Sequence, residues 1–260
     1  MLNCAINAAR QAGAILLDAG KQPTELSVTK KGIGDYVTQV DLACEKEIIR
    51  IIRNSFPGHQ IIAEESGMQR KDSPYQWIID PLDGTANFVH NLGIFGVSIA
   101  CMKDEQLILG VIYSPATSEL FWAEKGKGAF LNGRPIHVSK TDVFSEAMIA
   151  TGFPWRSRDL IDPYLAAFKD VLLKSAGMRR MGAAAIDLAY TACGRFEGFW
   201  EIHLKPWDVA AGAIIIEEAG GIISSLSKTG TVLDGSVVAG NRNIHDCLCS
   251  SITQHLGDIV

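Results

Sequence analysis

The residues of this sequence that are best suited to chemistry, by their type and spacing, are acidic. The clearest set lies in residues 77–88. This stretch reads Trp-Ile-Ile-Asp-Pro-Leu-Asp-Gly-Thr-Ala-Asn-Phe. Its apolar start predicts a buried strand, its proline and glycine place Asp80 and Asp83 in a turn, and Thr85 can open a short helix. Carboxylates hold hard divalent cations, and N–H groups at a helix start hold phosphate oxygens. The same residues are also typical of a plain surface turn.

Three further carboxylates belong with these two. Glu64 follows the short apolar stretch 60–63, which predicts a strand, and it would meet Asp80 if the two strands lie side by side. Asp208 follows Lys-Pro-Trp and Asp41 follows Thr-Gln-Val, so both stand near the starts of predicted helices. A carboxylate at a helix start is favoured by the helix dipole alone, and that explanation suffices for Asp208 taken singly.

The charges of these side chains indicate a metal centre if they converge. Each pair of carboxylates about 4 Å apart would cost about 4 kcal/mol at an effective dielectric constant of about 20. No lysine or arginine lies within the motifs Glu64-Glu65-Ser66, Asp80–Thr85 and Trp207–Gly212 to offset this repulsion. Divalent cations would offset it, and ligands that are all oxygen suit Mg²⁺ better than Zn²⁺. Bound cations would also let a chain with a net charge of −5 accept an anionic substrate.

Composition narrows the class of protein. The chain has 260 residues, 47% hydrophobic and 20% charged, which is enough for a full core in one large domain or two halves. Its cysteines and histidines show neither zinc spacing nor a Ser-His-Asp pattern. It has no long run of like charge, so a nucleic-acid groove is not indicated. We find no signal-peptide pattern and no membrane-spanning apolar run, and therefore expect a cytoplasmic protein.

The elements that must position the acidic residues change character along the chain. In the first half we expect two amphipathic helices, one over residues 2–19 and one ending near 56–58, and then the two acidic strands. An antiparallel meander follows, with strands at 95–103, 107–114, 119–124 and 129–139. The polar joint 141–146 divides the chain into residues 1–143, which carry most of the predicted metal ligands, and residues 144–260.

The second half alternates between strands and helices, which implies helices packed on a sheet. Strands are expected at 147–151, 178–181, 196–201, 222–224 and 237–239, and helices at 163–174, 183–193, 207–219 and 244–256. Trp155 and Arg156 could form a mobile rim near the site or a plain loop, and we favour the loop. The pair Arg179-Arg180 is assigned to the solvated surface or to a local anion contact.

Four blocks together resemble the inositol monophosphatase family, in the family's order and spacing over nearly the whole chain. They are Gly34-Asp35-x-Val37-Thr38-x-x-Asp41, Glu64-Glu65-Ser66, Asp80-Pro81-Leu82-Asp83-Gly84-Thr85 and Trp207-Asp208-x-Ala210-Ala211-Gly212 followed by Glu218-Ala219-Gly220-Gly221. One such block alone is a moderate signal, whereas four are a strong one. The bacterial type of the family is the nearest likeness. The resemblance implies an α+β fold, a layered α/β/α/β/α sandwich of the inositol monophosphatase and fructose-bisphosphatase type.

By this resemblance the protein is a Mg²⁺-dependent phosphatase that hydrolyses inositol 1-phosphate, binds two to three ions per subunit, is inhibited by Li⁺ and forms a homodimer. Glu64, Asp80 and the Leu82 carbonyl would hold a first ion, and Asp80, Asp83 and Asp208 a second, while Glu64 also contacts a third. Water activated by the metal would attack the phosphate. The catalytic set is then Glu64, Thr85 and Asp41, with Thr85 hydrogen-bonded to Asp41.

The resemblance also assigns the substrate contacts, which are Asp83, Gly84, Thr85, Gly182, Ala183, Ala184, Glu201 and Asp208. Backbone N–H groups of Gly84 and Thr85 would hold the phosphate, and Glu201 the hydroxyls of the alcohol. Two positions depart from the family's pattern. Ala86 stands where a threonine is frequent, and Ala183 where serine or threonine is frequent, which removes a hydroxyl contact and leaves the alcohol preference open.

Two alternatives remain at this level. One is a sister phosphatase acting on another sugar phosphate, on histidinol phosphate or on a 3′-phosphoadenosine phosphate, although no strongly basic or aromatic adenine pocket is evident in the sequence. The other is a scaffold or regulatory protein on the same fold. The presence of every expected ligand residue argues against lost activity, while an additional protein partner stays open.

Overall fold

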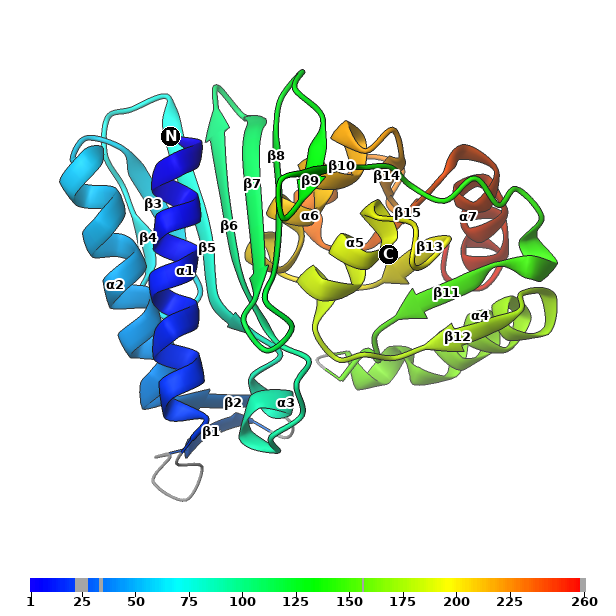
Figure 1. The fold of residues 1–260 in the computed structure, drawn as a ribbon. Coiled ribbons are helices and arrows are strands. Elements are labelled where there is room, and N and C mark those ends of the chain that lie inside the picture. Colours follow the sequence, from blue (N-terminus) through cyan, green and yellow to red (C-terminus); the bar gives the residue numbers. More distant parts are fainter. Residues whose placement is uncertain (22–27, 33–34, 156, 258–260) are drawn as a thin grey trace.

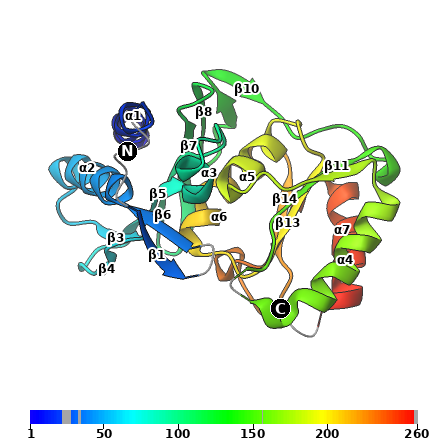
Figure 2. The ribbon, with the colours of Figure 1, turned by 90° about the horizontal axis from the view of Figure 1, so that it is seen from below.

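Five layers of secondary structure make up the fold, which Figure 1 shows with its sheets edge-on and Figure 2 shows from below. The computed structural model describes residues 1–21, 28–32, 35–155 and 157–257. From left to right in Figure 1 the layers are two helices, an eight-stranded sheet, two helices, a five-stranded sheet and two helices. This arrangement confirms the expected α+β class and the α/β/α/β/α sandwich.

The eight-stranded sheet has the strand order β10-β9-β8-β7-β6-β5-β3-β4. Its strands are β3 (Gln60–Ala63), β4 (Gly67–Gln69), β5 (Tyr75–Asp83), β6 (Gly96–Lys103), β7 (Gln106–Ser114), β8 (Glu119–Glu124), β9 (Ala129–Leu131) and β10 (Arg134–Ile136). Strands β3 and β5 are parallel, and β5 to β10 form the predicted antiparallel meander. The single strand predicted for 129–139 is wrong. A two-residue turn at Asn132 and Gly133, with φ of 49° and 77°, folds it into a hairpin.

Helices α1 (Leu2–Ala19) and α2 (Gln39–Ser55) cover one face of this sheet. Residues of β5 alternate between the two faces: Trp77 and Ile79 pack in the core with α1 and α2, whereas Ile78 belongs to the core on the other side. Before α2 lies a hairpin that the sequence analysis missed, made of β1 (Val28–Gly32) and β2 (Asp35–Thr38).

The five-stranded sheet has the order β12-β11-β13-β15-β14. Its strands are β11 (Met148–Thr151), β12 (Gly177–Arg179), β13 (Gly198–Glu201), β14 (Ile222–Ser225) and β15 (Val237–Gly240). Helices α4 (Ile161–Lys174) and α7 (Arg242–Leu256) cover its outer face. Adjacent residues of β13 separate the two sides, because Trp200 packs with these outer helices and Phe199 faces the centre of the molecule.

Helices α5 (Ala184–Ala192) and α6 (Pro206–Glu218) fill the space between the two sheets. Residues 209–216 of α6 are buried on every side of the helix, and all of them are apolar. Such a helix can lie only in a core. Gly110 of β7 lets α6 approach the eight-stranded sheet closely, since a Cβ atom there would lie 2.6 Å from the Ala211 carbonyl oxygen. The start of α6 is therefore held by tight packing on both sides.

A β-bulge in β5 departs from the sequence prediction, which ended the strand at Ile79 and placed Asp80 and Asp83 in a turn. Asp80 lies opposite Ser98 of β6 and Asp83 opposite Gly96, so β5 holds one extra residue between these pairs. Pro81 lies in the bulge, where its missing N–H is tolerated. In a regular strand Asp80 and Asp83 would face opposite sides. The extra residue allows both carboxylates to face the middle layer.

Shorter helices complete the described ranges. They are α3 (Thr85–Val89), as predicted from Thr85, and 3-10 turns at Phe144–Glu146, Arg158–Leu160 and Val232–Asp234. Within the described ranges, every helix is too short or too polar to span a lipid bilayer. The division of the chain at residues 141–146 stays a prediction.

Candidate active site

One cleft, with a volume of about 320 Å³, collects nearly all of the predicted site residues. Its wall includes Glu64, Asp80, Leu82, Asp83, Gly84, Thr85, Gly182, Ala183, Ala184, Glu201 and Asp208. Asp41 does not line the cleft but contacts Thr85, which does. Gly34, which begins the first of the resembling blocks, lies outside the described residues. Segments that are up to about 140 residues apart in the chain thus form one surface, because each ends at the same edge of the layered core.

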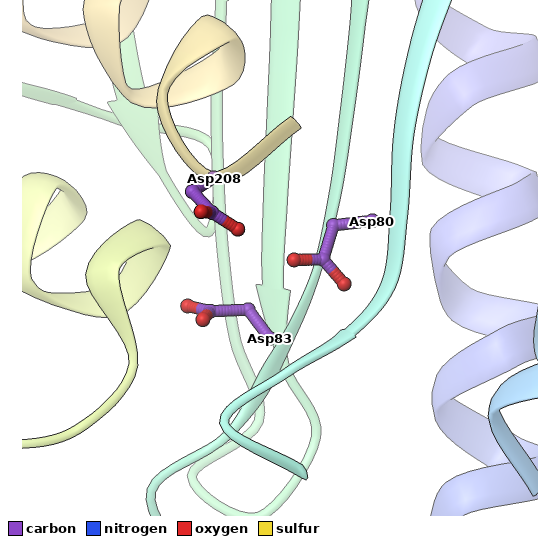
Figure 3. Close-up of side chains that lie close together, drawn as sticks. All are labelled: Asp80, Asp83 and Asp208. Atoms are coloured by element: carbon purple, nitrogen blue, oxygen red, sulfur yellow. The ribbon is translucent and has the colours of Figure 1, made fainter. Parts of the chain in front are cut away.

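Three carboxylates converge at the floor of the cleft, as Figure 3 shows. One oxygen each of Asp80, Asp83 and Asp208 lies within 4.8 Å of the others. Asp80 and Asp83 come from the bulged end of β5, and Asp208 comes from the first turn of α6. All three residues are buried. The predicted convergence is confirmed for these three side chains.

Repulsion and burial raise the pKa values of the two aspartates on β5. Burial raises the pKa of Asp80 well above its ordinary value, and the charges of Glu64, Asp83 and Asp208 raise it further. Burial and Asp208 raise the pKa of Asp83 to about 7, against the effect of backbone N–H groups from the start of α5. Without a counter-ion the ionised cluster is therefore unfavourable, and a cation among the carboxylates would relieve it.

Glu64 stands at the carboxyl end of β3, beside Asp80 at the end of β5. The two strands pair in parallel, with Ala63 opposite Ile79, and the Glu64 N–H donates to the Ile79 carbonyl at 3.2 Å. The neighbouring strands expected from the sequence are therefore confirmed. The charge of Glu64 is close enough to raise the pKa of Asp80. Glu64 thus extends the acidic floor of the cleft towards β3.

Asp83 also completes the start of α5. This helix begins after Ala183, whose side chain has no oxygen to accept a bond from the first N–H groups. The Asp83 carboxylate takes that place, since its Oδ2 accepts a bond from the Ala185 N–H at 2.8 Å. Asp83 therefore links the start of α5 to β5. Because Ala183 has no side-chain oxygen, a carboxylate of the acidic cluster takes this role.

Asp208 has a local bond of the same kind. Its Oδ2 accepts a bond from the Lys205 N–H at 2.7 Å, which closes the first turn of α6. The expected helix-start position is confirmed. The helix-dipole explanation accounts for this bond but not for the placement of the carboxylate against Asp80 and Asp83.

The hydroxyl of Thr85 lies between two oxygens, 3.1 Å from Asp41 Oδ1 and 3.0 Å from the Leu82 carbonyl. The predicted contact with Asp41 is confirmed. Asp41 is itself buried and its Oδ2 accepts bonds from the Thr38 N–H at 2.9 Å and the Thr38 hydroxyl at 2.6 Å. Burial raises the pKa of Asp41, whereas these hydrogen bonds act in the opposite sense. The Thr85 hydroxyl is thus held by a fixed acceptor on α2.

Gly84 precedes α3 and can only be glycine without strain. Its φ is 85°, in the left-handed region. A Cβ atom there would also lie 2.9 Å from the Ile94 carbonyl oxygen and 3.1 Å from the Ala183 side chain. Gly84 thus packs closely against its neighbours, and it also lines the cleft.

The opposite wall of the cleft holds residues that the sequence analysis placed elsewhere. Phe153, Trp155 and Arg180 line it together with Glu201. The Arg180 guanidinium lies over the Phe153 ring, 5.4 Å from its centroid. Trp155 is in a turn, as predicted, and it also lines the cleft, which agrees with the alternative that placed it near the site. Arg156 lies outside the described residues. Arg179 and Arg180 are exposed, as their assignment to the surface predicted, and Arg180 in addition lines the cleft.

Glu201 is the last residue of β13, as predicted. Its carboxylate lies against Gly152, the residue that follows β11. A Cβ atom on Gly152 would lie 1.9 Å from Glu201 Oε1, so only glycine leaves room for this carboxylate. Glu201 is therefore partly buried in the wall of the cleft, and its role there stays a prediction.

Comparisons with known proteins agree with this geometry. Residues 1–256 match the sequence profile of the inositol monophosphatase family. This chain belongs to the inositol monophosphatase family. A relative from Pseudomonas aeruginosa, named Nus factor SuhB, is 42% identical over 98% of this chain and 97% of its own. A relative from Mesorhizobium japonicum, named inositol-1-monophosphatase, is 41% identical over 98% of this chain and 97% of its own.

Solved structures of family members have the same fold. The crystal structure of the extragenic suppressor protein suhB from Bartonella henselae superposes with a TM-score of 0.94 at 38% identity, covering 97% of this chain and 98% of that one. The phosphatase class is therefore supported for this chain at the level of the family. The names of its relatives are divided between a monophosphatase and a Nus factor.

Proposed function

We propose that this protein is a Mg²⁺-dependent phosphomonoesterase that hydrolyses inositol 1-phosphate to inositol and phosphate. The observation that carries the proposal is the convergence of Asp80, Asp83 and Asp208 within 4.8 Å in a cleft that Glu201 also lines. A cluster of buried like charges stabilises no fold by itself. It is explained if cations bind there and an anionic ester binds against them.

The donor set fits Mg²⁺, because the converging groups are carboxylates. The raised pKa values of Asp80 and Asp83 mark a place that favours positive charge. Glu64, Asp80 and the Leu82 carbonyl would hold one ion, and Asp80, Asp83 and Asp208 a second, with Glu64 available to a third. Bound Mg²⁺ supplies Lewis-acid stabilisation of phosphate charge and makes water a better nucleophile.

The chain's own groups would orient the reaction. Thr85, held by Asp41 at 3.1 Å, can accept a hydrogen bond from an attacking water while it donates to the carboxylate. The backbone N–H groups of Gly84 and Thr85 would bind phosphate oxygens from the wall of the cleft, which both residues line. Asp41 acts here through Thr85, as the acceptor that fixes the direction of its hydroxyl.

The alcohol portion of the substrate would lie between Glu201 and the start of α5 at Gly182, Ala183 and Ala184. A carboxylate accepts bonds from hydroxyl groups, which suits a polyol such as inositol. The aromatic and basic wall at Phe153, Trp155 and Arg180 adds a surface that a nucleotide ring could use. Hydrolysis of nucleotide phosphates or of other sugar phosphates is therefore an alternative that the substrate panel must include.

A substrate panel tests this proposal. Phosphate release would be measured with Mg²⁺ for inositol 1-phosphate, 2′-AMP, glycerol 2-phosphate, histidinol phosphate and 3′-phosphoadenosine 5′-phosphate. We expect the highest kcat/KM for inositol 1-phosphate, loss of turnover in EDTA and inhibition by Li⁺. Full turnover in metal-free protein contradicts the mechanism, and a higher kcat/KM for another ester reassigns the substrate.

A Nus-factor role is the second candidate, because relatives that match over nearly the whole chain bear that name. In this role the chain would act through a protein partner. Replacing SuhB of Escherichia coli with this chain, and with its Asp83→Asn variant, tests the role. Equal growth with both would place the role outside hydrolysis, whereas failure of the unsubstituted chain would count against it. A homodimer and a cytoplasmic location are also proposals, which gel filtration and cell fractionation would test.

A further inference from the structure

Helix α2 carries two buried carboxylates that lie one turn apart on the same face. These are Asp41 and Glu45, and each is at most 4% exposed. Residues four apart on a helix project side by side. Asp41 reaches Thr85 at the start of α3. Glu45 instead contacts the backbone beside Glu64, and neither the sequence motifs nor the proposed reaction uses it.

Glu45 binds the loop that carries Glu64. Residues 64–66 form the three-residue connection between β3 and β4, where Ala63 pairs with Gly67. Glu45 Oε2 accepts a bond from the Glu65 N–H at 2.8 Å, and Oε1 accepts one from the Ser66 N–H at 2.9 Å. Both carboxylate oxygens are thus used by consecutive backbone groups of this loop.

We infer that Glu45 is a positioning residue for Glu64 and thereby sets the affinity of the site for a divalent cation. This inference rests on the proposed function, in which Glu64 is a cation ligand. The Glu64 Cα atom is held from both sides: its own N–H donates to the Ile79 carbonyl at 3.2 Å, and the next two N–H groups donate to Glu45. Without Glu45 the two N–H groups that follow Glu64 lose these acceptors.

The double contact requires a carboxylate. Bonds from N–H groups to an ionised acceptor are shorter and stronger than neutral ones. A glutamine at this position has the same shape but presents an NH₂ group to one of the two N–H donors, so the loop must move. An aspartate keeps the charge, but it is one methylene shorter and cannot span both donors in the same way.

The experiment measures cation binding directly. Mn²⁺ serves as the probe because it takes oxygen ligands as Mg²⁺ does, and its free concentration is read by electron paramagnetic resonance. We expect Glu45→Gln to weaken Mn²⁺ binding by about 10- to 100-fold, the usual effect of removing a group that orients a metal ligand. Glu45→Asp should give a smaller loss and keeps the test usable if the glutamine variant does not fold.

Glu218→Gln is the matched control. The Glu218 carboxylate also accepts two backbone bonds from a hairpin loop, from the Gly126 N–H at 2.7 Å and the Gly128 N–H at 2.8 Å, but that loop carries no cleft residue. Its variant should lose stability without losing Mn²⁺ affinity.

Wild-type Mn²⁺ affinity in both Glu45 variants, or an equal loss in Glu218→Gln, overturns the inference. These readouts need no substrate. A negative result for the Glu45 variants can therefore be distinguished from a wrong assignment of inositol 1-phosphate as the substrate. If the unsubstituted protein does not bind Mn²⁺, both proposals are overturned.

Discussion

The metal-free protein should lose stability as the pH rises through the window set by Asp83. Burial and the neighbouring Asp208 raise the pKa of this carboxyl from 3.8 to about 7 in the folded protein. Between these values the folded state binds a proton that the unfolded state has already released. Stability therefore falls as the pH rises, and it is highest below the ordinary pKa.

The magnitude follows from the size of that change. Each pKa unit corresponds to about 1.36 kcal/mol, so Asp83 alone accounts for a loss of about 4 kcal/mol across the window. The raised pKa of Asp80 acts in the same direction. The pKa of His59 is lowered by burial, which favours its neutral form and offsets a part of the loss near the top of the window. A loss of several kcal/mol is a large share of a typical folding free energy.

Urea unfolding in EDTA at about pH 5, 6 and 7 measures the effect, and the Asp83→Asn variant is its control. The amide cannot titrate but can still accept the bond from the Ala185 N–H, so the part of the pH dependence that is due to Asp83 should disappear, while the part due to other buried carboxylates such as Asp187 remains. Excess Mg²⁺ should restore about 2.7 kcal/mol at about 100 times its dissociation constant. The reasoning would be refuted if the free energy of unfolding without metal were constant or rose between about pH 5 and 7 in both the unsubstituted protein and the Asp83→Asn variant.

Three further predictions concern the site and its support. Asp208→Asn should abolish most turnover while the fold is kept, since asparagine is a good residue at a helix start; activity within about twofold would return Asp208 to a helix-dipole role. Glu201→Gln should lower kcat/KM for inositol 1-phosphate by about 10- to 150-fold, the loss of one charged hydrogen bond, but leave a small phosphate ester unaffected, whereas Thr85→Ala should slow both esters alike. Gly110→Ala should cost about 1–3 kcal/mol in urea unfolding, because its Cβ would lie 2.6 Å from the Ala211 carbonyl oxygen against which α6 packs; an unchanged midpoint would contradict this.

The acidic floor of the cleft was predictable from the sequence because local signals fixed each position. Asp41 and Asp208 stand where helices begin, and Glu64 and Asp80 end neighbouring strands. The five-layered architecture could not be predicted in this way. The periodicity of apolar residues predicted the helices and strands, but the arrangement of these elements in layers was predicted only from the family resemblance. The roles of the site residues remain predictions.

Other features depended on contacts that no local pattern reports. The Arg180 side chain reaches the cleft because the tertiary fold brings it over Phe153. The hairpin at Asn132-Gly133 had a usable signal, since this dipeptide is a strong hairpin former, and its neglect produced the single strand predicted for 129–139. The bulge in β5 had none, because proline and glycine near two aspartates suit a turn equally well.

That bulge ties the site to the register of β5 against β6. If the full-length segment paired with β6 as a regular strand, Asp83 would project from the face opposite to Asp80. The two carboxylates would then lie in different layers of the molecule, although no acidic residue had been replaced. A substitution of Pro81 that favours regular pairing should therefore weaken the cation site, even though the Pro81 side chain supplies no ligand.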